Sequence, residues 1–231
     1  MRNIAVILAG GAGNRMNSTV PKQFLEIAGK PMIAYSIDAF EQHSGVDEIV
    51  VVIHPAYFDI WESIVAKYNW KKVKKVLEGG DQRSDSTLVA LQAYAGVDEA
   101  HILFHDAARP LVSQRIISDT LKALEQFKAV TVAVPTADTI FQTDNSQIVI
   151  ARIPSRAFLR RMQTPQGFHL STIKQAYALA ADDPYFTVTD DCGVVHKYLP
   201  NEKIGLVEGE ENNFKITYPQ DITLMETIIL N

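Results

Sequence analysis

Glycines and two cations gather near the start of the chain, in a pattern suited to binding a polyphosphate. Residues 8–16 read LAGGAGNRM, and Lys22 follows in the segment PKQF. Glycines let backbone N–H groups approach a ligand closely, and Arg15 and Lys22 place two positive charges beside them. The sequence therefore predicts a phosphate cradle here, with a plain turn carrying a surface Arg and Lys as the alternative.

The spacing of these glycines excludes two common nucleotide loops. A Walker A loop requires Lys-Ser or Lys-Thr after its last glycine, and neither pair occurs here. A dinucleotide fingerprint requires GxGxxG at the start of a helix, whereas these glycines run GGxG and Arg15 stands where that helix would begin. A polyphosphate bound here would therefore occupy neither a Walker A loop nor a dinucleotide-binding loop.

A second candidate segment is HDAARP at residues 105–110. It follows a strongly apolar run, so Asp106 ends a predicted strand. A carboxylate there, facing bound phosphates, is suited to a divalent cation, and Arg109 could neutralise phosphate charge. The alternative is a local surface ion pair between Asp106 and Arg109.

A third segment, GGDQRSDS at residues 79–86, opens a predicted helix. Gly80 permits close backbone approach, while Asp81 and Ser86 are short polar groups able to contact a base or a ribose. Ser84 and Asp85 suit a helix N-cap equally well. Both interpretations stay open for this segment.

Weaker signals lie in the second half of the chain. Four side chains there supply donors for a second anionic substrate: Arg156, Thr164, Thr189 and Lys215. None of the six histidines stands in a triad-like context, and we expect His105 to pack at a strand end. The single cysteine, Cys192, has no matched base nearby in sequence, so we expect a packed thiol.

Composition limits the classes of protein. The chain has 231 residues, 21% charged and 47% hydrophobic, as in ordinary globular proteins. The net charge of −5 argues against a nucleic-acid partner. No apolar run reaches the roughly 20 residues of a membrane span, and no signal peptide is visible. With one cysteine and no disulfide, the expected location is cytoplasmic.

The candidate residues must be positioned by alternating strands and helices. The predicted strands are Asn3–Leu8, Glu48–Ile53, Lys74–Leu77, His101–His105 and Val130–Val134. The predicted helices lie near Met32–Gln42, Tyr57–Tyr68, Ser84–Ala93 and Arg115–Phe127. This alternation is typical of an α/β fold with a mainly parallel sheet. Since ligands of such sheets bind at the carboxyl ends of the strands, the polar loops gather in one crevice of a single domain, residues 1–231.

One segment breaks the alternation. Residues 138–142 and 147–153 look like two strands around the polar turn TDNS. An isolated hairpin is marginal in water, so this β-arm at about 138–153 requires a packing partner. We expect a second copy of the chain to supply it; the alternative is a hairpin folded back on its own domain.

Taken in order, these motifs resemble the polyol-phosphate cytidylyltransferase family, which includes the enzymes acting on methylerythritol phosphate and on ribitol 5-phosphate. The matching segments are LAGGAGNRM, PKQF, GGDQRSDS, HDAARP, QTPQGF, TDDC and EGEENNFKIT, which together run nearly end to end. The resemblance implies a nucleotide-diphospho-sugar-transferase-like (Rossmann-like) fold, a homodimer joined through the β-arm, and a Mg²⁺-dependent reaction with CTP.

The resemblance also implies roles for single residues. Arg15 and Lys22 would be catalytic, stabilising charge on the α-phosphate and on the leaving pyrophosphate. The implied nucleotide-binding residues are Leu8, Ala9, Gly10, Gly11, Ala12, Gly13, Gly80, Asp81, Arg83 and Ser86. Asp106 would also hold the metal. The implied acceptor-binding residues are Asp106, Arg109, Arg156, Thr164, Thr189 and Lys215.

The acceptor is the open point of the resemblance. HDAARP favours the methylerythritol branch, whereas IPSRAFL at residues 153–159 and the Cys of TDDC favour the ribitol branch. We expect CDP-ribitol as the product, for a surface polymer, with methylerythritol 4-phosphate and isoprenoid synthesis as the alternative. A CTP-binding module without turnover, and an enzyme using UTP or another nucleotide, are the remaining possibilities.

Overall fold

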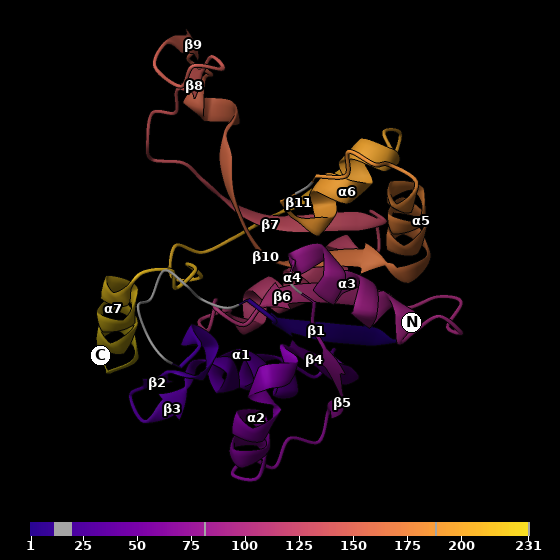
Figure 1. Cartoon of the computed structure of the whole chain (residues 1–231), viewed down its shortest axis with the longest axis vertical. Helices are drawn as coiled ribbons and strands as arrows, with labels where there is room; N and C mark the ends of the chain where they lie inside the picture. The colour runs from indigo at the N-terminus through magenta and orange to yellow at the C-terminus, as the bar shows by residue number, and fades with distance from the viewer. Residues whose placement is uncertain (12–19, 81, 188, 231) are drawn as a thin grey trace.

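A seven-stranded sheet forms the centre of the computed structural model, which describes residues 1–11, 20–80, 82–187 and 189–230 (Figure 1). The strands stand in the order β11-β7-β10-β6-β1-β4-β5. Their bounds are β1 Asn3–Ala9, β4 Glu48–Ile53, β5 Val73–Glu78, β6 His101–Asp106, β7 Ala129–Pro135, β10 Arg160–His169 and β11 Ile204–Glu208. All run parallel except β10, which is antiparallel to its neighbours β6 and β7. The mainly parallel α/β fold is confirmed.

Helices cover both faces of this sheet. Those packed on one face are α1 Met32–Glu41, α2 Phe58–Val65 and α4 Gln114–Ala123; those on the other are α3 Arg83–Gln92, α5 Leu170–Ala181 and α6 Asp191–Tyr198. Successive side chains of β1 alternate between the two apolar cores, with Ile7 in the first and Val6 in the second. Burial on both faces explains why the central strands read as unbroken apolar runs. Among the described residues, no helix has the length and apolarity needed to cross a membrane.

A small third core lies beside the start of α1. The C-terminal helix α7 Pro219–Leu230 packs there with the short strands β2 Glu26–Ile27 and β3 Lys30–Pro31. Its fully buried members include Ile27, Met32, Ile216 and Met225. Through Ile216 this core anchors the chain that carries Lys215, because the Ile216 N–H donates to the Ala108 carbonyl at 2.8 Å.

The sheet has a switch point beside β1. The chain proceeds from β1 to β4 and β5 on one side, and then returns to β6 on the other. Loops diverge at such a point and leave room for a ligand at the carboxyl ends of the strands. Here Leu8 on β1 pairs with Asp106 on β6 in the parallel register. The glycine loop and the HDAARP segment therefore leave the sheet side by side.

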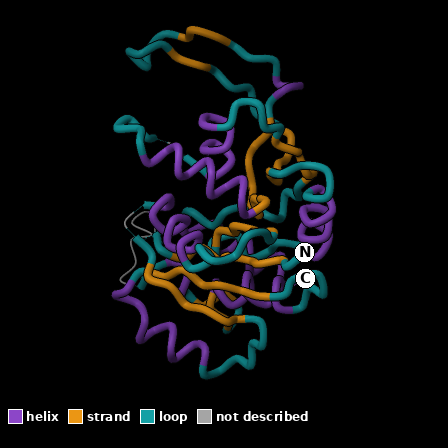
Figure 2. Tube along the Cα trace, turned by 90° about the vertical axis from the view of Figure 1, so that its right-hand side faces the viewer, coloured by secondary structure: helices purple, strands orange, loops and turns teal. Residues whose placement is uncertain are grey.

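The β-arm projects away from the body of the molecule (Figures 1 and 2). It contains β8 Gln142–Thr143 and β9 Ile150–Arg152, joined by two antiparallel residue pairs. These strands are shorter than the sequence predicts, and Thr143, expected in the turn, lies in a strand. Among the described residues β8 and β9 pair only with each other, in a sheet separate from the seven-stranded one. An isolated two-stranded ladder of this kind is marginal in water.

Candidate functional site

The glycine-rich loop after β1 lies against the first turn of α3. A Cβ atom added to Gly10 would stand 2.8 Å from the Ser86 Oγ, and one added to Gly79 would stand 3.0 Å from it. At Gly80 an added Cβ would overlap the Asp85 side chain. Only glycine fits these three positions without displacing a neighbour. The two segments assigned to the nucleotide therefore lie together at the sheet edge.

The backbone of the glycine loop is held by Gln23, a residue of PKQF that sequence reasoning did not single out. Its buried amide donates from Nε2 to the Ala9 carbonyl at 2.7 Å and to the Gly11 carbonyl at 3.2 Å. The Leu8 carbonyl accepts the Ala107 N–H at 3.0 Å. Four predicted site residues, Ala12, Gly13, Arg15 and Asp81, lie outside the described residues.

Lys22 joins the first and last segments of the site. It begins the short 3₁₀ helix η2 Lys22–Phe24, and its Nζ donates to the Ile216 carbonyl at 2.8 Å. Ile216 follows Lys215 directly in the chain. Two predicted site residues from opposite ends of the sequence are thus brought to one place.

Asp106 is the buried carboxylate of this cluster. Its Oδ2 lies 2.7 Å from the Lys215 Nζ, and its Oδ1 lies 3.5 Å from the Arg83 Nε. Burial would raise the pKa of Asp106, but Lys215 and then Arg83 outweigh burial and hold this pKa well below its usual value. Asp106 is therefore a carboxylate at neutral pH, between the cations of Arg83 and Lys215.

Arg109 is buried behind Asp106 and is not a surface partner of it. Its Nη1 donates to the Asn213 carbonyl at 2.8 Å, and its Nη2 donates to the Met162 carbonyl at 3.1 Å. Within the described structure its buried Nε has no hydrogen-bond partner. Arg109 thus ties β10 to the segment around Asn213, and the local surface ion pair considered from sequence is not what forms.

Thr164 lies within β10 and not in a loop beyond a strand end. The register of β10 shifts between Gln163 and Gln166, which is where a strand accommodates a proline. The Thr164 hydroxyl is fully buried; it accepts the Asp106 N–H at 3.1 Å and lies 3.0 Å from the His105 Nδ1. In this structure Thr164 positions the end of β6.

His105 completes this chain of bonds as a packed strand-end residue, as expected. Its Nε2 lies 3.0 Å from the Arg109 carbonyl, which can only accept, so the ring is the Nε2–H tautomer and the Thr164 hydroxyl donates to Nδ1. Burial, the largest cause, lowers the pKa of His105 to about 4. Cys192 is likewise buried, and burial raises the pKa of its thiol.

The TDDC segment reaches the site through α6. Asp190 is the N-cap of this helix and accepts the Gly193 N–H at 2.8 Å, as an Asp before a helix should. Thr189 is exposed, and its hydroxyl donates to Asp190 at 3.4 Å. Asp191, which follows Asp190, is fully buried, and its Oδ2 lies 2.5 Å from the Arg83 Nη1. The sequence alone assigns no separate role to Asp191.

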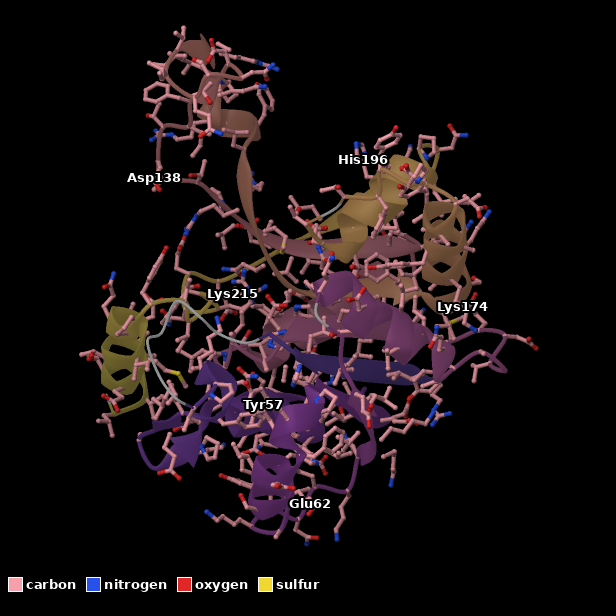
Figure 3. The ribbon with its side chains drawn as sticks, viewed as in Figure 1. Tyr57, Glu62, Asp138, Lys174, His196 and Lys215 are labelled. Carbon is pink, nitrogen blue, oxygen red and sulfur yellow. The ribbon has the colours of Figure 1, made fainter. Side chains whose placement is uncertain are left out.

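Arg156 is not brought to this cluster by its own chain. It begins the short helix η4 Arg156–Phe158, which extends the arm beyond residue 153, and it donates to the Ala137 carbonyl at 2.8 Å. In Figure 3, Asp138 marks the root of the arm, and Lys215 lies in the body below it. Its predicted contact with an acceptor stays a prediction.

The described part of the site has a consistent chemistry. At the switch point of the parallel sheet, Arg83 and Lys215 flank the ionised carboxylate of Asp106. Lys22 is bonded to the residue after Lys215, and the glycine-rich loop leaves the sheet beside Asp106. Such a set suits the neutralisation and alignment of two anionic reactants, which is what phosphoryl-type transfer requires. Among the site residues described above, neither His105 nor Cys192 offers a free general base or nucleophile.

Comparison with known proteins agrees with this chemistry. A sequence profile of the IspD family, described as 2-C-methyl-D-erythritol 4-phosphate cytidylyltransferase, matches residues 3–231. A protein of that name from Thermobifida fusca is 47% identical over 232 residues, covering 99% of this chain and 93% of the relative. A bifunctional ribulose 5-phosphate reductase/CDP-ribitol pyrophosphorylase from Haemophilus influenzae is 40% identical, covering 98% of this chain and 48% of the relative.

A solved structure extends the comparison to the fold. The crystal structure of 4-diphosphocytidyl-2C-methyl-D-erythritol synthase from Anaerococcus prevotii matches with a TM-score of 0.87 at 30% identity. The match covers 100% of this chain and 96% of that one. The chain therefore belongs to the IspD family and is a CTP-dependent cytidylyltransferase.

Proposed function

We propose that the acceptor is 2-C-methyl-D-erythritol 4-phosphate, so that the product is its CDP derivative and the pathway is isoprenoid synthesis. The observation that carries this proposal is the name of the 47% identical relative, which aligns over nearly the whole of both chains. The expectation of ribitol 5-phosphate, drawn from IPSRAFL and TDDC, has weaker support. The relative whose name includes CDP-ribitol is 40% identical, and it is a bifunctional protein of which this chain covers 48%.

The reaction follows from the charges in the site. A phosphate oxygen of the acceptor attacks the α-phosphorus of CTP, the bond from that phosphorus to the bridging oxygen breaks, and pyrophosphate leaves with the electron pair. A phosphate monoester is already an anion at neutral pH, so no strong base is needed. The barrier lies in repulsion between the anions, which nearby cations reduce.

The cations divide between the two substrates. Arg15 and Lys22 neutralise the triphosphate and the departing pyrophosphate, while the glycine loop and α3 hold the nucleotide. Lys215, now paired with Asp106 at 2.7 Å, faces the acceptor phosphate together with Thr189. Thr164 holds the backbone of Asp106, and Arg109 ties β10 to the segment around Asn213 that precedes Lys215.

Mg²⁺ fits this site as a cation held mostly by substrate. Asp106 presents a carboxylate at the strand end, and Mg²⁺ is commonly bound by one or two carboxylates plus substrate phosphates. Within the described ranges of the chain, no group of three His, Cys, Asp or Glu side chains forms a separate metal site. Once bound, Mg²⁺ would neutralise charge on the triphosphate.

The arm supports a homodimer as part of the proposal. Its apolar side chains are unusually exposed for a single chain: Ile148 by 86% and Phe158 by 88%. Ile140, Phe141, Val149, Ile150 and Ile153 are exposed as well. A second copy of the chain would bury them, and Arg156 on the same arm could then reach the acceptor phosphate of the partner.

A ribitol 5-phosphate acceptor remains the second candidate, favoured by the Haemophilus influenzae relative. Pyrophosphate release with CTP and Mg²⁺ distinguishes the two, using each acceptor alone and no acceptor as the blank. We expect kcat/KM at least about tenfold higher with 2-C-methyl-D-erythritol 4-phosphate. A higher value with ribitol 5-phosphate would reverse the assignment, and exchanging CTP for UTP in the same assay tests the nucleotide.

A further inference from the structure

Asp191 is a fully buried carboxylate that the mechanism above does not use. It is the first residue of α6, and its two oxygens have different partners. Oδ1 accepts from the Thr87 hydroxyl at 2.8 Å and from the Tyr177 hydroxyl at 2.7 Å. Oδ2 lies 2.5 Å from the Arg83 Nη1. A buried carboxylate with one cation on one oxygen is a directional anchor for that cation.

Arg83 bridges two carboxylates in consequence. Its Nη1 is held by Asp191, and its Nε lies 3.5 Å from the Asp106 Oδ1. Burial would lower the pKa of Arg83, but Asp191 first and then Asp106 raise it, so the guanidinium stays charged. The pair with Asp191 is short and the pair with Asp106 is long, which identifies Asp191 as the carboxylate that fixes the plane of the guanidinium.

This geometry leaves the other oxygen of Asp106 to Lys215. If Asp191 lost its charge, the Arg83 guanidinium would no longer be held back and could close on Asp106. It would then compete with Lys215 for the same carboxylate. Arg83 is also the first residue of α3 and lies within the segment GGDQRSDS, so its orientation links that segment to Asp106 and Lys215.

We propose that Asp191 is a positioning residue for cytidylyl transfer: it holds the Arg83 guanidinium at a fixed distance from Asp106, so that Asp106 and Lys215 keep their arrangement. Asp191 acts only through Arg83 and touches neither substrate. The proposal rests on CTP-dependent transfer and not on which polyol phosphate is the acceptor.

A double-mutant cycle tests this dependence. Asp191→Asn, Arg83→Gln and the double variant are assayed for kcat by pyrophosphate release at saturating substrates, and for free energy of unfolding in urea. We expect Asp191→Asn to lower kcat about tenfold or more in the wild-type background, but less than about twofold in the Arg83→Gln background. A merely structural role would give the same fold-change in both backgrounds, and that result would overturn the proposal.

Two control variants separate positioning from packing. Tyr177→Phe removes one bond to the other oxygen of Asp191 and leaves the pair with Arg83; we expect lower stability with kcat within about twofold. Asp183→Asn removes a partly buried carboxylate that pairs with Lys197 at 2.8 Å beyond the end of α5, and kcat should stay at the wild-type value. An equal loss of kcat in Tyr177→Phe and Asp191→Asn would also overturn the proposal.

If Asp191→Asn fails to fold, Arg83→Lys carries the test. A lysine keeps the positive charge, but a single ammonium cannot face both carboxylates in the same geometry. We expect kcat to fall about tenfold with unchanged free energy of unfolding, and wild-type kcat would contradict the proposal. Each assay uses the acceptor that supports wild-type turnover, so an error in the proposed acceptor appears in the wild type and an error about Asp191 only in the variants.

Discussion

The sheet edge and the β-arm are opposite kinds of structure within one chain. The edge is built from residues that are nearly or fully buried: His105, Asp106, Arg109 and Thr164. Hydrogen bonds and ion pairs join them to segments from across the sequence. In the arm, two short strands carry apolar side chains that are largely exposed. The edge is organised by its own chain, whereas the arm has the composition of an interface.

This difference indicates where substrate binding and assembly should separate. Groups that are already held in place lose little further freedom when a ligand binds. A single chain should therefore bind CTP at the edge without the arm. If Arg156 acts through a second copy as proposed, its loss should affect binding of the acceptor and not of the nucleotide.

The largest expected effect is on the edge, from Lys22→Ala. The substitution removes the ammonium group that we propose stabilises charge developing in the transition state. We therefore expect kcat to fall about 100- to 1,000-fold. The Kd for CTP should rise far less, by about tenfold or below. Stopped-flow or steady-state pyrophosphate release measures the first quantity, and calorimetric titration the second.

A matched control is Lys128→Ala, which removes a lysine that is 61% exposed and pairs with Glu202. Its kcat should match that of the wild type. Turnover near the wild-type rate at saturating CTP in Lys22→Ala would refute the catalytic role of Lys22.

The next largest effect is on the pH dependence of stability, which tests the burial of His105 at the sheet edge. In the unfolded chain His105 takes up a proton near pH 6.5, but in the folded chain only near pH 4. Between these values the unfolded state binds more protons, so stability falls as pH falls, by up to about 3 kcal/mol in free energy of unfolding. Urea unfolding of the wild type and of His105→Gln from pH 7 to pH 4 measures this part of the slope.

The His105→Gln variant should lose stability at pH 7 but show a shallower pH dependence than the wild type. His196→Gln, which alters an exposed residue of α6 (Figure 3), serves as the control and should keep the wild-type slope. Parallel slopes for His105→Gln and the wild type would mean that the strand end opens to water.

A third effect tests the arm. Phe158→Asp places a charge where an apolar ring is 88% exposed, and the dimer should weaken by about 30-fold, or roughly 2 kcal/mol. Sedimentation equilibrium measures the dimer constant. Tyr185→Asp, at a residue 84% exposed but outside the arm, should leave association unchanged. Equal association in Phe158→Asp and the wild type would exclude this part of the arm from the interface.

The smallest effect concerns the contact between the two nucleotide segments. Gly10→Ala would place a Cβ 2.8 Å from the Ser86 Oγ, a side chain that can rotate away, so we expect a loss of about 1 kcal/mol in free energy of unfolding. Gly96→Ala, where an added Cβ meets no atom within 4 Å, should not lose stability. Equal stability of the two variants would argue against close packing of the loop on α3.

Much of the body of the fold was predictable because local patterns and global packing agree there. Apolar runs such as Glu48–Ile53 are buried on both faces, and the predicted ends of most strands and helices fall within a few residues of the structure. The arm was predicted as a hairpin, but the predicted strands are longer than those in the structure, because the strands lack partners that would extend their pairing. The small core beside α7 is formed by residues that are far apart in the sequence, so no local sequence pattern predicts it.

The site was predictable where a residue stands at the end of a strand, as Asp106 does. It was not predictable where a role depends on a partner far away in sequence. Gln23 holds the glycine loop and Asp191 holds Arg83 through bonds that only the folded chain creates. A sequence pattern suggests the type of residue at an N-cap such as Asp190, but it does not show that the next carboxylate is buried.

The most direct test of the separation between edge and arm is a CTP titration on a chain that cannot pair. Phe158→Asp with Ile148→Asp combines two exposed arm positions, and its mass is checked by sedimentation at the titration concentration. If the edge is organised by one chain, the Kd for CTP stays within about twofold of the wild-type value while the protein is monomeric. A Kd that rises in step with loss of the dimer would contradict this account.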